Sequence, residues 1–141
     1  AGKEQRFRRD INHCISKELV AAAEGTASGI VLEDLTHIRS QITVRKQQRV
    51  RHHGWSFKLL RSFIMYKALM AGIEVKLVNP RYTSQRCSNC GCIDKKHRKS
   101  QYHYLCSNCG YDAHADYNAA CNLAYLGNSG VINFLKAEAI N

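Results

Sequence analysis

The segment that decides the local fold is Cys87–Gly110, which reads CSNCGCIDKKHRKSQYHYLCSNCG. The same pentapeptide, Cys-Ser-Asn-Cys-Gly, stands at both ends, and fifteen residues separate the two Cys-x-x-Cys pairs. A two-residue gap lets both sulfurs of one turn reach one ion, and the following glycine permits left-handed backbone. Because four thiolates fill a tetrahedral shell, the spacing predicts a structural zinc ion held by Cys87, Cys90, Cys106 and Cys109.

The other three cysteines are not expected to bind this metal. Cys92 falls on the wrong side of the first turn, whereas Cys14 and Cys121 fall in predicted helices, where cysteine usually packs as a small apolar residue. His97 and His103 lie between the pairs, but nothing in the sequence favours either of them over a sulfur. The odd cysteine count and the paired spacing argue for reduced thiols and a metal rather than disulfides.

Length and composition indicate one folded, soluble domain. The chain has 141 residues, of which 45% are hydrophobic and 23% are charged. No apolar run approaches the roughly 20 residues that span a bilayer, and the first six residues, AGKEQR, lack the apolar core of a signal peptide. These features predict a cytoplasmic protein that does not contact a membrane.

The charge balance points to a polyanionic partner. Lys and Arg number 21 against 11 Asp and Glu, which gives a formal net charge of +10. Four zinc-bound thiolates with their ion would add about −2. The excess that remains favours nucleic acid over a membrane surface, and the alternative is a basic surface that serves only solubility.

Hydrophobic periodicity predicts an α/β order of elements. Ile11, Ile15 and Leu19 recur every fourth position, so they are expected to form the buried stripe of a first helix, which Val20, Ala22 and Ala23 extend. A short apolar run then indicates a buried strand that ends in Glu33 and Asp34 at one edge of a sheet. The predicted elements are a helix ending near Gly25, a strand over 29–33, a helix over 55–71, a strand over 73–78 and a final helix over 114–127.

Two stretches concentrate positive charge. Residues 36–54 contain no acidic residue and form either a basic helix or a loop. Residues 95–99 precede Tyr102 and Tyr104, which either stack on a base or pack the small ribbon. The missing countercharge favours phosphate contact. The predicted nucleic-acid-binding residues are Arg39, Arg45, Lys46, Arg49, Arg51, Lys95, Lys96, Arg98 and Lys99.

The carboxylates are weak evidence by themselves. Glu33 at a strand end is usually solvated, and Asp116 has a plain explanation as the N-cap of the last helix. Asp112 is a weaker candidate that lies one helical turn earlier if the helix begins that soon.

Several short motifs occur together along the chain. They are Ile30–Leu35, Trp55–Phe57 with Tyr66 and Lys67, Val78–Pro80 leading to Thr83–Gln85, the two cysteine pairs, and Ala115–Asn122. In this order they resemble the C-terminal half of the TnpB (OrfB) family of transposon-associated proteins, which is related to the RuvC-type nuclease domains of type V CRISPR effectors. The resemblance covers about Lys3 to about Leu126.

The resemblance implies an α/β, partial RNase H-like (RuvC) fold with the four-cysteine zinc ribbon inserted before the last helix. It implies a parent RNA-guided DNA endonuclease of a bacterial or archaeal cell, with DNA and a guide RNA as partners. Mg²⁺ or Mn²⁺ would be held by Glu33, which matches the family's second acidic residue, and by Asp116, which matches the third. The implied division is a RuvC-like part over 1–81, a zinc ribbon over 82–111, a final RuvC-like helix over 112–127 and a tail over 128–141.

One part of the family pattern has no match. The family's first catalytic Asp sits on an early strand, and Asp10 lies in a predicted helix instead. The expectation is therefore a C-terminal portion that is inactive or nearly so alone, because a site without one carboxylate binds metal poorly. The strand that ends in Glu33 would also expose an edge that invites self-association. The alternative from another class is a non-catalytic zinc-ribbon module that binds DNA or RNA.

Overall fold

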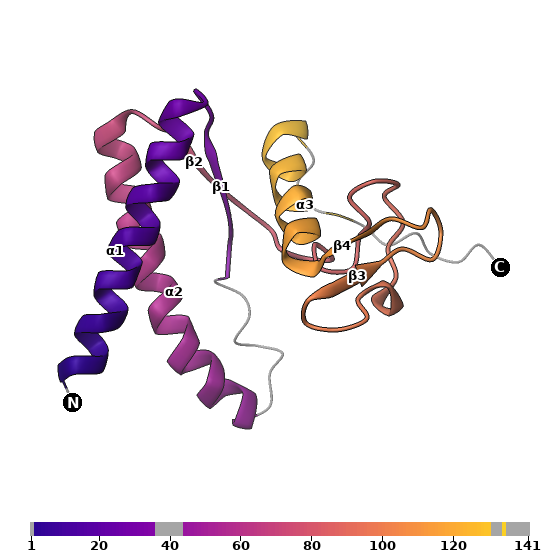
Figure 1. The fold of residues 1–141 in the computed structure, drawn as a ribbon, viewed down its shortest axis with the longest axis horizontal. Coiled ribbons are helices and arrows are strands. Elements are labelled where there is room, and N and C mark those ends of the chain that lie inside the picture. Colours follow the sequence, from indigo (N-terminus) through magenta and orange to yellow (C-terminus); the bar gives the residue numbers. More distant parts are fainter. Residues whose placement is uncertain (1, 36–43, 131–133, 135–141) are drawn as a thin grey trace. The chain divides into compact units, whose positions relative to one another are not determined.

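The computed structural model describes residues 2–35, 44–130 and 134, and residues 44–56 as helical backbone only. The chain divides into two compact units, one made of residues 1–30 and 36–76 and the other of residues 31–35 and 77–141 (Figure 1). None of the helices in the described parts combines the length and apolar character that crossing a membrane requires.

The first unit is built on two helices that lie side by side, α1 (Gly2–Gly25) and α2 (Val44–Ala71) (Figure 1). Helix α2 begins at Val44 rather than at Trp55, so the part of the basic segment from Val44 onward is helical. The Lys67 ammonium of α2 donates to the His13 carbonyl oxygen at 2.9 Å and to Ser16 Oγ at 2.7 Å on α1. The Lys67 ammonium between the two helices is therefore bound by oxygen atoms of a carbonyl and a hydroxyl rather than by a carboxylate.

The buried face of α1 agrees with the prediction only in part. Val20 and Ala23 are buried as predicted, whereas Ile11, Ile15 and Leu19 are exposed and the polar residues Asn12 and Ser16 are buried instead. The apolar stripe and the packed stripe are neighbouring faces of one helix, and Lys67 selects the face that offers it oxygen acceptors. Periodicity located the helix and its buried residues Val20 and Ala23, but not the buried polar positions Asn12 and Ser16.

Strands β1 (Ile30–Glu33) and β2 (Val75–Val78) form a two-stranded sheet. The Ile30 amide donates to the Glu74 carbonyl at 2.9 Å, and the Asp34 amide donates to the Val78 carbonyl at 2.7 Å. Both partners advance by four residues, so the strands are parallel and α2 is the crossover between them. The predicted α/β order is confirmed, and both strands are slightly shorter than expected.

The second unit contains a small ribbon. Strand β3 (His103–Leu105) pairs in antiparallel register with β4 (Asp112–His114), with Tyr104 opposite Ala113. A short 3₁₀ helix, η2 (Lys95–His97), precedes them. The core of the ribbon consists of Cys87, Tyr104, Cys106 and Ala115. A core of this size is too small to stabilise a domain by itself. In such small ribbons, metal binding supplies a large part of the folding free energy.

Helix α3 (Ala115–Ser129) completes the unit. The final helix predicted over 114–127 is present; it begins at Ala115, because residues 112–114 form β4, and it runs on to Ser129. Gly130, with φ of 76°, supplies the left-handed cap. Gly127 instead lies buried inside the helix, where a Cβ would collide with Val31 of β1.

Candidate metal centre and nucleic-acid interface

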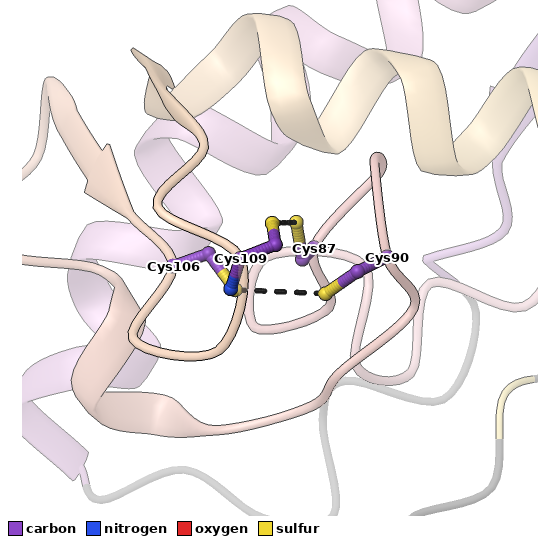
Figure 2. A group of neighbouring side chains, drawn as sticks. All are labelled: Cys87, Cys90, Cys106 and Cys109. Atoms are coloured by element: carbon purple, nitrogen blue, oxygen red, sulfur yellow. Dashed lines mark hydrogen bonds between the residues drawn. The ribbon is translucent and has the colours of Figure 1, made fainter.

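The structure brings the four predicted cysteines together. The sulfur atoms of Cys87, Cys90, Cys106 and Cys109 all lie within 4.8 Å of one another, and Figure 2 shows them converging from two separate turns. Within the described ranges this is the one group of three or more histidine, cysteine or acidic side chains close enough to share a metal ion. The three remaining cysteines stand outside it.

The sulfur spacing fits zinc and excludes disulfides. Cys87 Sγ lies 3.6 Å from Cys109 Sγ, and Cys90 Sγ lies 3.6 Å from Cys106 Sγ. A disulfide would need about 2.05 Å. Tetrahedral thiolates at about 2.3 Å from zinc are about 3.8 Å apart, so the observed pairs are close to the edges of such a tetrahedron. The residues present therefore suit a closed four-thiolate site.

The two turns repeat one backbone design. Gly91 N donates to the Cys87 carbonyl at 2.8 Å, and Gly110 N donates to the Cys106 carbonyl at 3.0 Å. Both glycines are left-handed, with φ of 84° and 80°. The identical pentapeptides thus form equivalent turns, as the sequence predicted.

Each turn supplies one buried and one exposed sulfur. Cys87 and Cys106 are 0% and 2% exposed, and burial raises the pKa of both thiols, that of Cys87 to about 12. Cys90 and Cys109 are exposed. A hydrogen bond from the Asn108 side chain lowers the pKa of Cys90 to about 6, and one from the Asn89 side chain lowers the pKa of Cys109.

The histidines between the pairs are bound to other groups. His103 Nε2 lies 2.9 Å from Asp112 Oδ1, so the weaker candidate Asp112 is on strand β4 and has a partner there. The ring of His97 is completely buried and contacts Tyr104 Oη at 3.0 Å and Ser107 Oγ at 2.8 Å.

The two tyrosines of the ribbon separate into different roles. The Tyr104 hydroxyl donates to the Gln85 carbonyl at 3.0 Å and is 0% exposed, so this ring packs the ribbon. It then accepts from His97 Nδ1, which leaves Nε2 to accept from Ser107. Tyr102 is 63% exposed, with its ring 5.9 Å from that of His114. Of the two, Tyr102 is the ring that a base can reach.

Two asparagines that sequence reasoning left without a role clamp the first turn onto α3. Asn118 Oδ1 accepts from Ser88 N at 2.9 Å, and Asn118 Nδ2 donates to the Arg86 carbonyl at 2.8 Å. Asn122 Nδ2 donates to the same carbonyl at 2.7 Å and to the Thr83 carbonyl at 2.9 Å. Both side chains are 0% exposed. Their i, i+4 spacing in a predicted apolar helix was the available signal.

The Arg86 side chain adds to this clamp. Its Nη1 donates to Asn122 Oδ1 at 2.8 Å, and its guanidinium carbon lies 4.9 Å from the ring centroid of Tyr125 and 4.4 Å from that of Phe134. Phe134 is buried although it lies in the tail from which the sequence predicted nothing. Arg86 is thus held by an amide and two rings.

Asp116 lies in the first turn of α3 and is not its N-cap. His114 is the cap, and its Nδ1 accepts from Asp116 N at 3.1 Å. The Asp116 carboxylate is exposed and lies 3.9 Å from Arg98 Nη2. The guanidinium of Arg98 is itself fixed by the carbonyls of Ser100 and Gln101, at 3.3 and 3.1 Å. A predicted phosphate-binding residue therefore stands beside a predicted catalytic carboxylate.

Glu33 ends β1, as predicted, and burial raises the pKa of its carboxyl although its side chain keeps an exposed surface. Such shifts are common where carboxylates do chemistry. In the described part of the chain, neither Glu33 nor Asp116 belongs to a group of three candidate metal ligands.

The predicted basic residues fall into two sets. Lys95, Lys96 and Lys99 are exposed around η2, while Arg98 is half-buried. Arg39 lies outside the described residues. Four others lie on the N-terminal half of α2, where the structure describes backbone alone: Arg45, Lys46, Arg49 and Arg51.

Fold and site together define a four-cysteine ribbon protein of mixed helix and strand. A family model described as "Cas12f1-like, TNB domain" matches residues 57–123. A CRISPR-associated endodeoxyribonuclease Cas12f1 of Sulfoacidibacillus thermotolerans is 45% identical over 119 residues, which are 84% of this chain and 27% of that protein. A TnpB-like protein of Methanocaldococcus jannaschii is 39% identical over 124 residues, which are 87% of this chain and 44% of that protein. The chain belongs to the TnpB family.

Solved structures agree on the fold. A Cas12f1–sgRNA–target DNA complex matches 92% of this chain and 36% of its own chain, with a TM-score of 0.69 and 24% identity. CasPhi-2 (Cas12j) bound to crRNA matches 93% of this chain and 22% of its own, with a TM-score of 0.66 and 20% identity. The chain thus spans less than half the length of the proteins that it matches.

Proposed function

We propose that this chain is the RuvC-like, zinc-ribbon portion of a transposon-associated, metal-dependent DNA endonuclease. The observation that carries the proposal is the clamp of Asn118 and Asn122, which ties the four-cysteine centre to the helix that bears Asp116. Relatives named as endodeoxyribonuclease Cas12f1 and as a putative RNA-guided DNA endonuclease of Escherichia coli support it. The parallel pair β1 and β2 is then part of an RNase H-like sheet, with Glu33 at a strand end.

Zinc has a structural role in this proposal. Cys87, Cys90, Cys106 and Cys109 would fill all four positions of the ion, so none remains for water or substrate. The ion would hold together a ribbon that has four core residues.

Glu33 and Asp116 would hold Mg²⁺ or Mn²⁺. When bound, such an ion activates water and stabilises a leaving oxygen. Two carboxylates make an incomplete site, and in the part of the chain that the structure describes neither Glu33 nor Asp116 belongs to a group of three metal-binding side chains. We therefore expect little or no cleavage by the 141-residue chain alone.

DNA is the proposed partner, with a guide RNA as a second one. Lys95, Lys96 and Lys99 present their charges on the surface of the ribbon, where the ring of Tyr102 is also exposed. A phosphate bound by Arg98 would lie beside Asp116, because the two side chains approach to 3.9 Å. The solved Cas12f1 relative, whose complex holds sgRNA and target DNA, supports both partners.

Self-association through β1 belongs to the same proposal. In the described residues β1 has β2 as its one neighbour in a two-stranded sheet, so its second edge is available for pairing. A concentration-dependent mass from light scattering would support this, and a constant monomer mass would contradict it.

A non-catalytic nucleic-acid-binding module is the second candidate. The observation in its favour is that the cysteines form the one described cluster of three or more metal ligands. It predicts DNA affinity without Mn²⁺ binding at Glu33 and Asp116.

Metal binding and cleavage separate the two candidates. The zinc-loaded chain is incubated with end-labelled single-stranded DNA, with and without Mg²⁺ or Mn²⁺, and bound Mn²⁺ is followed by electron paramagnetic resonance. The nuclease proposal expects weak Mn²⁺ binding that Glu33→Gln abolishes and that the matched Glu24→Gln variant on exposed α1 retains. Equal Mn²⁺ binding in both variants would favour the binding module, and cleavage unaffected by Glu33→Gln would refute the assigned site.

Salt dependence tests the nucleic-acid surface. Each phosphate contact on a single strand contributes about 0.7 to the slope of log affinity against log salt. The Lys95→Ala/Lys96→Ala chain should lose about 1.4 from that slope. The control pair, Lys3→Ala/Lys17→Ala on α1, should leave it unchanged. Equal slopes in the two double variants would place the contacts elsewhere.

A further inference from the structure

The repeated pentapeptide contains an asparagine that chelation does not require. A zinc turn needs its two cysteines and the glycine that follows them. Asn89 and Asn108 occupy the same position in the two turns, immediately before the second cysteine of each pair. Both side chains are exposed, so neither is there to fill the core.

Each of these side chains reaches across to the other turn. Asn89 Nδ2 donates to Cys109 Sγ at 3.5 Å, and Asn108 Nδ2 donates to Cys90 Sγ at 3.5 Å. The two bonds are equivalent and run in opposite directions, so each turn contributes one donor to its partner. The symmetry follows from the doubled sequence.

The sulfurs that receive these bonds are the exposed pair. Cys90 and Cys109 face solvent, whereas Cys87 and Cys106 are almost completely buried. Backbone hydrogen bonds within the second turn reach the buried sulfur, as in the bond of Cys109 N to Cys106 Sγ at 3.5 Å. The asparagine amides therefore serve the two sulfurs that water, chelators and other reagents can approach.

We propose that Asn89 and Asn108 form a reciprocal pair that stabilises the exposed thiolates of the opposite turns and slows the release of zinc. Four thiolates around one Zn²⁺ carry a net charge of about −2, and a donor to a charged sulfur makes a stronger hydrogen bond than one to a neutral group. Each bond also links the two turns directly. A cysteine that dissociates from the ion therefore remains hydrogen-bonded to the opposite turn, which favours its return.

A competing explanation is that asparagine is simply a good turn residue. Serine and aspartate share that property, but neither presents an N–H group at that reach. If the turn preference were the reason, Asn89→Ser and Asn108→Asp would behave like the wild-type chain. If the donor is the reason, serine removes the bond and aspartate replaces it with a repelling carboxylate.

Zinc transfer measures the proposed role directly. The zinc-loaded chain is mixed with an excess of a chromophoric chelator, and the first-order rate of zinc loss is compared for Asn89→Ser, Asn108→Ser, the double variant and Ser88→Ala, a neighbouring position in the same turn. Loss of a hydrogen bond to a metal ligand typically weakens metal binding roughly 10-fold or more, so each single variant should release zinc roughly 10-fold faster. The double variant should exceed both, and Ser88→Ala should stay close to the wild-type rate.

Cobalt substitution supplies a second readout on the same chains. The thiolate-to-metal charge-transfer bands of Co²⁺ should shift in the asparagine variants while the tetrahedral bands persist, because the bonds tune the sulfurs and do not replace them. Unchanged transfer rates and spectra in the double variant would overturn the proposal. Complete loss of the tetrahedral bands in a single variant would also overturn it, because the asparagine would then be needed to form the site.

Discussion

Truncation of Asn118 tests the clamp between the first cysteine turn and α3. This side chain is 0% exposed and makes two hydrogen bonds, one from Ser88 N and one to the Arg86 carbonyl. In Asn118→Ala both bonds are lost, but their consequences differ, because only one of the two partners has another bond.

The cost follows from those two partners. The Arg86 carbonyl still accepts from Asn122 Nδ2 at 2.7 Å, so the loss there is that of an ordinary hydrogen bond, about 1 kcal/mol. Ser88 N, in a half-buried residue, keeps no equivalent partner, and a donor left unpaired away from water costs roughly 1–3 kcal/mol. The free energy of unfolding should therefore fall by about 2–4 kcal/mol, a substantial part of the typical total of roughly 5–15 kcal/mol.

Denaturant unfolding of the zinc-loaded chains, followed by circular dichroism, measures this difference. Asn128→Ala is the matched control, because Asn128 lies on the same helix with an exposed side chain bonded to the Ala124 carbonyl. That variant should stay within about 0.5 kcal/mol of the wild-type chain. Equal stability of Asn118→Ala and Asn128→Ala would refute the clamp.

Three further outcomes are expected. Burial raises the pKa of Glu33, so above its unfolded pKa the charged carboxylate opposes folding. Glu33→Gln should therefore be more stable than the wild-type chain at pH 7, and this gain in the free energy of unfolding should vanish as the pH falls to roughly 4. A gain independent of pH would contradict this reasoning. Gly127→Ala should lower the free energy of unfolding, measured by thermal unfolding, by about 1–3 kcal/mol because the added Cβ clashes with Val31. A second change, Val31→Ala, should restore part of this loss. An unchanged stability of Gly127→Ala would show that the contact is loose. Removal of zinc by a chelator should abolish hydrogen-exchange protection in β3 and β4 while α1 and α2 keep theirs, since the ribbon has a core of four residues; protection that persists would mean that the ribbon folds without metal.

The metal centre was predictable because its geometry is local. Two cysteines and a glycine fix each turn by themselves, and the turns need only meet. The clamp was not predictable in the same way, because Asn118 and Asn122 bond to backbone atoms more than thirty residues away. The family motif includes the segment that carries both asparagines, but it implies a role only for Asp116.

The helices show what periodicity can and cannot decide. The pattern located α1 and its buried residues Val20 and Ala23, but it also predicted burial of Ile11, Ile15 and Leu19, whereas the contact with Lys67 required oxygens on the neighbouring face. The sequence predicted that the last helix ends at Gly127, because glycine often follows the end of a helix. In the structure Gly127 lies within α3, and its lack of a side chain leaves room for Val31. In both cases a partner distant in sequence decided the outcome.

The bond from Ser88 to Asn118 also bears on the order in which the chain folds. These residues are thirty positions apart, so the unaided chain must close a loop of that length to make the contact. An ion bound by both turns holds Cys109 close to the cysteines that flank Ser88, and Cys109 is nine positions before Asn118. The loop that must then close to bring Asn118 to Ser88 has about eleven positions. Loop-closure entropy then falls by about 0.9 kcal/mol, equivalent to a several-fold faster encounter. Stopped-flow folding should therefore show α3 docking after zinc uptake, at a rate that rises with zinc concentration until uptake is no longer limiting.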